Sequence, residues 1–208
     1  MYKRQLSDPD LYARDPERFA QLTAAIDKAR AERAAAEERW LTLAEQAEAL
    51  AQTSKDIPML RKISFYNSYL EGWALYAEQL SDEIGGYSGI ENAGYLQSFL
   101  FRASRLVVDT GLNSKGWSRE KAVDYMTATT GFPRPRVQRE VERYCASIGQ
   151  ACSYKIGHLA WLRAREKAKS ILGSKFDIHE FHEVLKEGAM PLTILEKRVE
   201  ERARAQLA

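Results

Sequence analysis

The sequence predicts an all-α protein: a long N-terminal coiled-coil-like helix followed by an α-helical bundle. Apolar residues recur at the three- and four-residue spacing of helices, and no segment shows the alternation of a half-buried strand. Proline and glycine residues then divide the chain into helix-length segments. We expect the long helix within residues 1–52 and the bundle within residues 53–208.

The N-terminal segment has the spacing of a coiled coil. Asp15 and Pro16 have the form of an N-cap and a first helical residue, which predicts a helix over residues 16–51. Positions at alternating steps of three and four residues form a seam that is apolar except at Arg33. The seam consists of Phe19, Leu22, Ile26, Ala29, Arg33, Ala36, Trp40, Leu43, Ala47 and Leu50. Such a seam needs a partner helix, so self-association is one expectation.

Capping and turn residues divide the second segment. The predicted helices cover residues 58–83, 90–108, 118–130, 135–146 and 150–172. Ser118 can cap the third of these helices. Asp177 and Glu180 form a predicted capping box for a helix that carries His179 and His182, and a charged helix follows it.

Composition excludes several classes of protein. The 31 basic and 29 acidic residues give a net charge of +2, so no overall field would draw nucleic acid or an anionic membrane. No apolar run is long enough to span a bilayer, and the first ten residues lack the apolar core of a signal peptide. As written, the chain is expected to stay in the cytoplasm. Cys145 and Cys152 are expected to be reduced thiols.

Four stretches of the second segment carry a family resemblance. They are DIPMLRKISFYNSYLEGWALYAEQL, RLVVDTGLNSKGWSREKAVDYM, ERYCASIGQACSYKIGH and FDIHEFHEVLKEGAMPL. In this order and spacing they resemble the C-terminal part of the bacterial family named domain of unknown function 885. Members look like α-helical zinc metallopeptidases of the gluzincin kind. The resemblance therefore implies the back half of such a fold.

The resemblance also implies a metal site of which this chain holds one part. Catalytic zinc takes about three protein ligands and leaves a position for water. In intact relatives an upstream helix carries a His-Glu and Pro-Gly-His stretch, and Glu71 here matches the carboxylate ligand. The three histidines of this chain, His158, His179 and His182, all lie downstream. We therefore expect intact relatives to bind zinc and hydrolyse peptides, and this chain alone to be inactive and metal-free.

Four further residues are implied as pocket or catalytic positions. Tyr154 is the candidate donor to the oxyanion of the tetrahedral intermediate, and the alternative is a core tyrosine. Asn113 stands where the family commonly has histidine, so it cannot titrate near neutral pH. Gln150 and Arg105 are weaker candidates. Arg105 lies four residues before Asp109, which suggests either an internal ion pair or a clamp for a substrate carboxylate.

The HEFHE segment is close to a zincin motif but one residue short of it. His179 and His182 are three residues apart instead of four, so we expect His182 to pack or cap within the bundle. The bundle is also expected to expose apolar surface that upstream helices cover in intact relatives.

A second resemblance covers residues 6–50. The stretch LSDPDLYARDPERFAQLTAAIDKARAERAAAEERWLTLAEQ looks like the C-terminal coiled-coil tail of ABC-F type ATP-binding proteins. The alternative function is therefore a non-catalytic interaction module that binds protein, nucleic acid or ribosome. The two resemblances meet where the zinc helix should stand, so the chain is either a natural fusion or decayed gene, or an assembly artefact or truncated chain. Intact peptidase-like relatives are often exported, which leaves the native compartment open.

Overall fold

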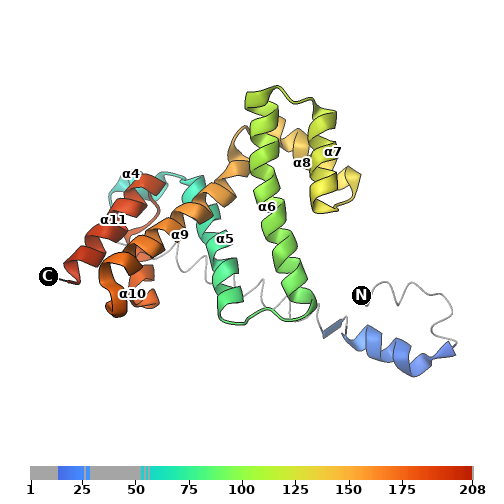
Figure 1. Cartoon of the computed structure of the whole chain (residues 1–208), viewed down its shortest axis with the longest axis horizontal. Helices are drawn as coiled ribbons and strands as arrows, with labels where there is room; N and C mark the ends of the chain where they lie inside the picture. The colour runs from blue at the N-terminus through green and yellow to red at the C-terminus, as the bar shows by residue number, and fades with distance from the viewer. Residues whose placement is uncertain (1–13, 26, 29–52, 54, 56, 208) are drawn as a thin grey trace. The chain divides into compact units, whose positions relative to one another are not determined.

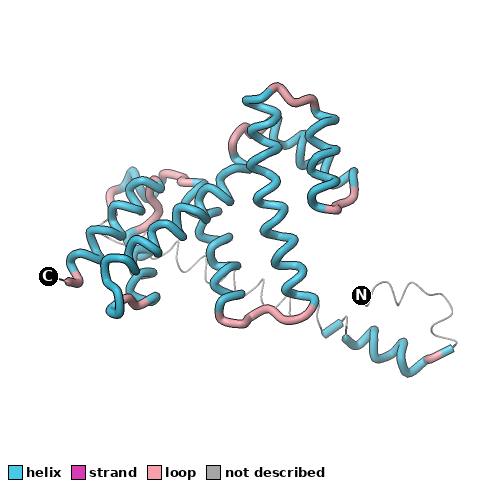
Figure 2. The backbone as a smooth tube through the Cα atoms, in the orientation of Figure 1, coloured by secondary structure: helices cyan, strands magenta, loops and turns pink. Residues whose placement is uncertain are grey.

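The computed structural model describes residues 14–25, 27, 28, 53, 55 and 57–207 (Figure 1). The chain divides into two compact units, Met1–Ser54 and Lys55–Ala208. Every described residue lies in a helix, a turn or a loop, and the described part contains no strand (Figure 2). The all-α prediction is confirmed. Its finer form, the back half of a gluzincin-like fold, stays a prediction.

In the first unit, the described residues form a helix over 16–25. Asp15 Oδ1 accepts a hydrogen bond from the backbone N–H of Arg18 at 2.9 Å, as an N-cap does. The predicted cap is therefore confirmed. Leu22, a seam position, is buried. Most of the predicted long helix and of its seam lies outside the described residues.

The second unit is built from a series of α-helices and short 3-10 helices (Figure 1). They are α4 (Met59–Ile63), α5 (Asn67–Glu83), α6 (Ile90–Lys115), α7 (Arg119–Thr130), α8 (Arg134–Ala146), η1 (Gln150–Cys152), α9 (Ser153–Leu172), η2 (Gly173–Lys175), α10 (Ile178–His182), η3 (Glu183–Glu187) and α11 (Leu192–Ala205). None of the helices in the described part of the chain combines the length and the apolar character that crossing a membrane requires.

Two hydrophobic clusters hold these helices together. The first cluster lies among α5, α9, α10 and α11 and includes Trp161, whose indole N–H donates to the Tyr69 carbonyl at 3.3 Å. The second lies among α6, α7 and α8 and includes Val108, Met126 and Val141. Helix α9 follows directly after η1, which contributes to the second cluster. The rest of α9 packs in the first cluster. The candidate residues Gln150 and Tyr154 belong to this connecting stretch.

The predicted N-caps Ser118 of α7 and Asp177 of α10 are confirmed, whereas no hydrogen bond from the Asp177 N–H to the Glu180 side chain completes the predicted capping box within the described residues. Ser118 Oγ accepts from the Lys121 N–H at 3.1 Å. Asp177 Oδ1 accepts from the N–H groups of His179 and Glu180 at 2.8 and 3.0 Å. Each cap satisfies N–H groups that the first helical turn leaves without a partner.

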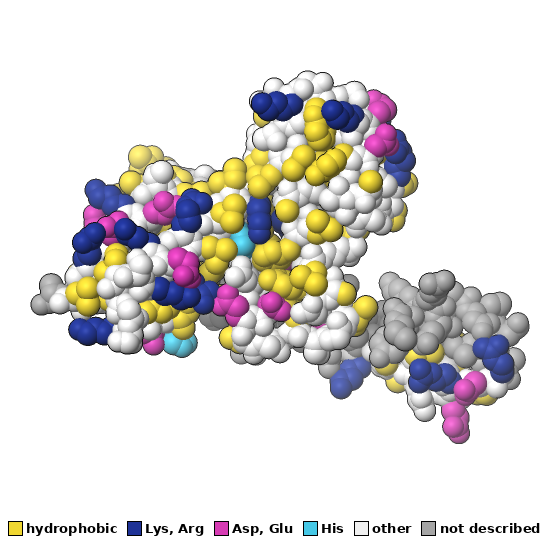
Figure 3. Space-filling model, viewed as in Figure 1, with side chains coloured by type: hydrophobic (Ala, Val, Ile, Leu, Met, Phe, Trp, Pro, Cys, Tyr) yellow, Lys and Arg dark blue, Asp and Glu magenta, His cyan; other side chains and the backbone are white. Residues whose placement is uncertain are grey.

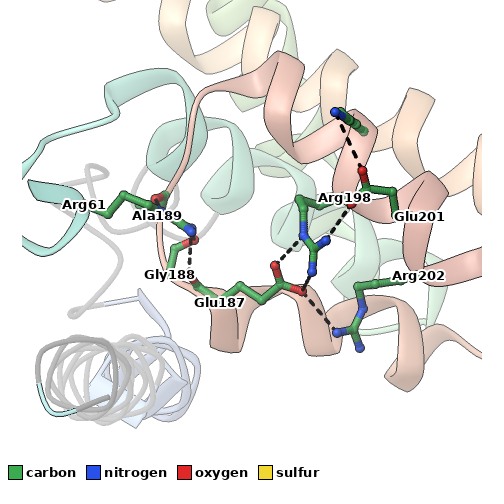
Figure 4. Close-up of polar contacts among 8 residues, drawn as sticks. Arg61, Glu187, Gly188, Ala189, Arg198, Glu201 and Arg202 are labelled. Atoms are coloured by element: carbon green, nitrogen blue, oxygen red, sulfur yellow. Dashed lines mark hydrogen bonds and ion pairs between the residues drawn. The ribbon is translucent and has the colours of Figure 1, made fainter. Parts of the chain in front are cut away.

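The prediction of one helix over residues 58–83 was wrong. Ser64 adopts an extended conformation and ends α4, and α5 begins only at Asn67. Arg61 of α4 is anchored at a distant part of the chain. Its guanidinium donates to the carbonyls of Glu187, Gly188 and Ala189 at 2.6, 3.1 and 3.3 Å, which holds α4 against the loop before α11 (Figure 4).

The helix predicted over residues 90–108 is longer than expected. α6 continues to Lys115 and ends at Gly116, which adopts a left-handed conformation with φ of 63°. Gly111 lies inside the helix because Trp117 packs on it: a Cβ there would lie 2.6 Å from the indole ring. This glycine serves packing and does not end the helix.

Several large apolar side chains of the bundle are exposed, while the prediction that upstream helices cover them in longer relatives stays a prediction. Leu96, Leu100 and Val107 of α6 are 58%, 43% and 39% exposed, and they share one face of the helix. Figure 3 shows apolar side chains gathered over the region of α5, α6 and α9. Met59, Leu60, Ile63 and Phe65, in and after α4, are each more than 70% exposed.

Candidate functional site

Glu71 and Gln150 meet although 79 residues separate them. Glu71 is partly buried near the start of α5, and its Oε1 accepts from Gln150 Nε2 at 3.4 Å. Gln150 opens η1 directly after Gly149, whose φ of 78° favours glycine. Asp109 accepts from the Gly149 N–H with both carboxylate oxygens, each at 3.1 Å. The turn that presents Gln150 to Glu71 is therefore fixed by a buried carboxylate.

Arg143 of α8 connects Gln150 to Glu140. Its Nη1 donates to Gln150 Oε1 at 2.6 Å, and its Nη2 donates to Glu140 Oε2 at 3.1 Å. The amide of Gln150 is thereby oriented with its oxygen towards Arg143 and its nitrogen towards Glu71. Sequence analysis did not select Arg143 or Glu140. The three-residue spacing of these two residues on α8 predicts an ion pair within the helix, and it does not predict the contact with Gln150.

One carboxylate oxygen of Glu140 accepts three hydrogen bonds. Besides Arg143, its Oε2 accepts from Arg105 Nη2 at 2.9 Å and from the Tyr144 hydroxyl at 3.0 Å. Burial disfavours the charged carboxylate, but the positive charges of Arg105 and Arg143 outweigh it and hold the pKa of Glu140 below its usual value. Glu140 is thus held as the anion between two guanidinium groups.

Arg105 joins this group to Tyr154. The side chain of Arg105 is buried, and its Cζ lies 4.8 Å from the centroid of the Tyr154 ring and 4.4 Å from that of Phe101. Cation–π contacts of this length are attractive. Arg105 Nε is buried and finds no hydrogen-bond partner among the described residues. A buried N–H group without an acceptor lowers the stability of the fold, because it has lost its hydrogen bonds to water.

The predicted site residues therefore fall into two groups. Glu71, Gln150, Arg105 and Tyr154 lie along one chain of contacts that runs through Arg143 and Glu140. Asn113 lies apart from this chain.

Asn113 braces the end of α6. It is exposed, and its Nδ2 donates to Asp109 Oδ1 at 3.1 Å and to the Tyr144 carbonyl at 3.3 Å. The expected ion pair between Arg105 and Asp109 was wrong. Within the described residues Arg105 pairs with Glu140, because α8 packs beside α6 and supplies a carboxylate, while Asp109 holds Gly149.

A second polar cluster escaped the sequence analysis. His158 is buried, with Nε2 at 2.7 Å from Gln79 Oε1 and Nδ1 at 3.2 Å from Lys155 Nζ. Burial, followed by the charge of Lys155, lowers the pKa of His158 to about 4. The imidazole is therefore neutral near pH 7, accepting from Lys155 and donating to Gln79. No spacing in the sequence pairs positions 79 and 158.

The HEFHE segment packs as predicted. His182 Nε2 lies 3.1 Å from the Tyr76 hydroxyl, and the His182 ring meets the Trp73 ring edge-on at 5.2 Å. Burial is the main cause that lowers the pKa of His182 to about 4. His179 is exposed. Within the described ranges no group of three or more His, Cys, Asp and Glu side chains could hold a metal ion. The described residues alone thus do not fit a zinc site.

A family model described as "Bacterial protein of unknown function (DUF885)" matches residues 44–199, which is most of the chain. The chain belongs to the DUF885 family. The matched range begins and ends earlier than the 53–208 expected from the sequence. It includes Glu71, Arg105, Glu140, Gln150 and Tyr154.

The chain is also similar to a solved structure. It matches the crystal structure of a candidate lipoprotein from Colwellia psychrerythraea with 47% sequence identity and a TM-score of 0.72. The match covers 76% of this chain and 28% of that protein. This chain therefore spans less than a third of the length of the protein it matches. No curated protein matches the chain.

The N-terminal residues match a different family. A model described as "ABC transporter C-terminal domain" matches residues 2–45. The two matched ranges meet at residues 44 and 45, so segments of two families are joined in one chain, as the two resemblances predicted.

Proposed function

We propose that the DUF885 region is the C-terminal part of a zinc-dependent peptidase site, which longer family members complete with an upstream histidine-bearing helix. Peptide-bond hydrolysis by a zinc-activated water would be the activity of those longer proteins. The observation that supports this proposal is the chain of contacts from Glu71 through Gln150, Arg143 and Glu140 to Arg105. It places a carboxylate and a tyrosine from two crossing helices in one polar network.

Each residue has a defined part in this proposal. Gln150 donates to one oxygen of Glu71 and so orients the carboxylate, leaving the other oxygen for a metal ion. Tyr154, whose ring lies on the Arg105 guanidinium, is the donor to a developing oxyanion. Glu140 neutralises Arg105, so that Arg105 positions the tyrosine ring and is not itself an unbalanced charge.

Catalytic zinc takes about three protein ligands, and no group of three or more His, Cys, Asp and Glu side chains among the described residues could hold a metal ion. We therefore propose that the 208-residue chain alone does not hydrolyse peptides. The proposal concerns the site to which this region contributes in longer proteins.

The longer protein from Colwellia psychrerythraea allows a direct test. Zinc content would be measured by mass spectrometry and hydrolysis by release of products from a mixed peptide library. Replacing the residue that superposes on Glu71 by alanine should reduce bound zinc and abolish hydrolysis. Replacing the residue that superposes on Tyr154 by phenylalanine should lower kcat and leave zinc content unchanged. An unaltered protein without stoichiometric zinc and without hydrolysis would overturn the proposal.

A second proposal rests on the match of residues 2–45 to an ABC transporter C-terminal domain. Here the N-terminal segment is an interaction module for protein, nucleic acid or ribosome, and the bundle is its support. Cosedimentation of the chain with ribosomes at increasing salt tests it. Binding that requires residues 1–52 would support the module, and equal sedimentation of a chain without them would contradict it.

A further inference from the structure

Three arginines of α8 lie on one face of the helix. Arg136, Arg139 and Arg143 follow one another at steps of three and four residues, which places them in one row along the helix. Arg136 and Arg139 are exposed, and Arg143 is partly exposed. We refer to these three residues as the arginine row. It ends at Arg143, which contacts Gln150 and hence the Glu71 network.

The positive charge of the arginine row is only partly balanced. Arg139 has no hydrogen-bond or ion-pair partner among the described residues, and Arg136 has no carboxylate partner among them. Arg136 instead stacks on Phe132, with its Cζ 3.7 Å from the ring centroid. Of the five guanidinium donors that Arg143 carries, two are used by Glu140 and Gln150. The row thus presents free donors in a line.

The carboxylates of α8 do not neutralise the row. Glu140 is shared with the buried Arg105 and with Tyr144, and its pKa stays below the usual value because these groups require the anion. Glu142 lies three residues after Arg139, but it is paired with Arg119 of α7. An anion from outside the chain is the available partner for Arg136 and Arg139.

We propose that the arginine row binds peptide segments carrying two or three carboxylates, next to Glu71. This names acidic peptides as the substrate class of the proposed peptidase site, and it rests on that proposed function. Guanidinium groups bind carboxylates through paired, charge-assisted hydrogen bonds, and successive row positions can each take one carboxylate.

A nucleic acid fits this surface less well than a peptide. The affinity of a protein for a phosphate backbone grows with the number of Lys and Arg contacts, and the row supplies three in a chain whose net charge is +2. The row also ends beside two carboxylates, Glu140 and Glu71. These would repel a continuous phosphate backbone, whereas a peptide can place neutral residues there.

Fluorescence anisotropy with the whole chain tests the proposal. The probe is a labelled eight-residue peptide with three glutamates, and the reference is the same peptide with three glutamines. The glutamate peptide should bind, and binding should weaken as salt is raised. Arg139→Gln should raise its Kd about tenfold, because one charge-assisted pair is lost. Arg139 is exposed and without partners in the described part, so the variant should keep the fold, which circular dichroism checks.

Arg134→Gln is the matched control. Arg134 lies on a different side of α8 and is already paired with Asp124, so this variant should change the Kd by less than about twofold. Equal binding of the two peptides, an equal effect of the two variants, or tighter binding of a single-stranded oligonucleotide of the same charge would each overturn the proposal.

The measurement separates this proposal from the proposed peptidase function. All titrations contain EDTA, so they require neither zinc nor hydrolysis. If the glutamate peptide binds while the longer Colwellia protein shows no zinc or hydrolysis, the peptidase proposal fails and the binding surface stands. If the glutamate peptide does not bind while the Colwellia protein contains zinc and hydrolyses peptides, acidic peptides are not the substrate class and the peptidase proposal stands.

Discussion

Gly72 of α5 and Gly157 of α9 touch through their backbones. A Cβ atom added to Gly72 would lie 2.3 Å from the carbonyl carbon of Gly157, and one added to Gly157 would lie 1.9 Å from the Ser68 carbonyl oxygen. Only glycine allows this approach. Glu71 adjoins one glycine and Tyr154 precedes the other by three residues, so the crossing sets the two candidate residues on neighbouring helices.

Gly72→Ala should therefore destabilise the bundle. The added methyl group meets backbone that cannot rotate away, and we expect the free energy of unfolding to fall by about 3 kcal/mol. Urea denaturation followed by circular dichroism measures the change. Gly94→Ala is the control, because a Cβ there meets nothing within 4 Å inside α6. The control should raise stability by about 0.5–1 kcal/mol. Equal midpoints for the two variants would show that the close crossing does not exist in solution.

Glu140→Gln should destabilise the fold by removing the anion beside a buried cation. Arg105 would keep its charge without its carboxylate partner, and we expect a loss of about 2–4 kcal/mol. Glu142→Gln removes a neighbouring carboxylate on the same helix whose ion pair with Arg119 is exposed, so its effect should be small. Chemical denaturation of both variants provides the comparison. Similar losses for both would argue against a special role of Glu140.

Arg61→Ala should release α4 from the bundle. The guanidinium makes three hydrogen bonds to backbone carbonyls before α11, and their loss should cost about 2 kcal/mol in unfolding free energy (Figure 4). Hydrogen exchange of residues 57–66 should accelerate. Arg163→Ala, which removes an exposed pair with Glu196, should leave this exchange unchanged. Unaltered exchange in Arg61→Ala would mean that other contacts hold α4.

Stability should fall as pH decreases from about 6.5 to about 4. Burial lowers the pKa of His158 and of His182 to about 4, whereas unfolded histidine titrates near 6.5. Between these values the unfolded chain binds more protons, so acid favours unfolding. Each histidine contributes at most about 1.4 kcal/mol per pH unit.

Urea midpoints measured across this pH range test the histidine prediction. His158→Gln and His182→Gln should each reduce the slope of stability against pH. His179→Gln changes an exposed histidine and is the control. A slope that neither buried-site variant reduces would mean that other groups, the carboxylates above all, govern the acid transition.

Local features of the fold were predictable from the sequence. The caps at Asp15, Ser118 and Asp177 were correct because a side chain and the N–H groups two or three residues later decide them. The two errors concern the break at Ser64 and the length of α6. Arg61 of α4 reaches a loop more than 120 residues away, and α6 continues past Val108 through Gly111, on which Trp117 packs.

The candidate site was predictable only in part. Family resemblance selected Glu71, Gln150, Arg105 and Tyr154, and the structure brings them into one network, while their proposed roles stay untested. Arg143 and Glu140 were missed because a charged pair three residues apart is also typical of any solvated helix face. Asn113 was selected by motif and lies outside the network, where it braces Asp109 and the Tyr144 carbonyl.

By itself the sequence determined the helical class, the capped helix starts and the joining of two family segments, because each depends on residues close together along the chain. The tertiary structure decided which partner each charged side chain has. Arg105 could pair with Asp109 on its own helix, but the packing of α6 against α8 offers Glu140 and leaves Asp109 to hold the Gly149 turn. Such a choice depends on the relative energies of distant contacts in a folded core, which no local spacing encodes.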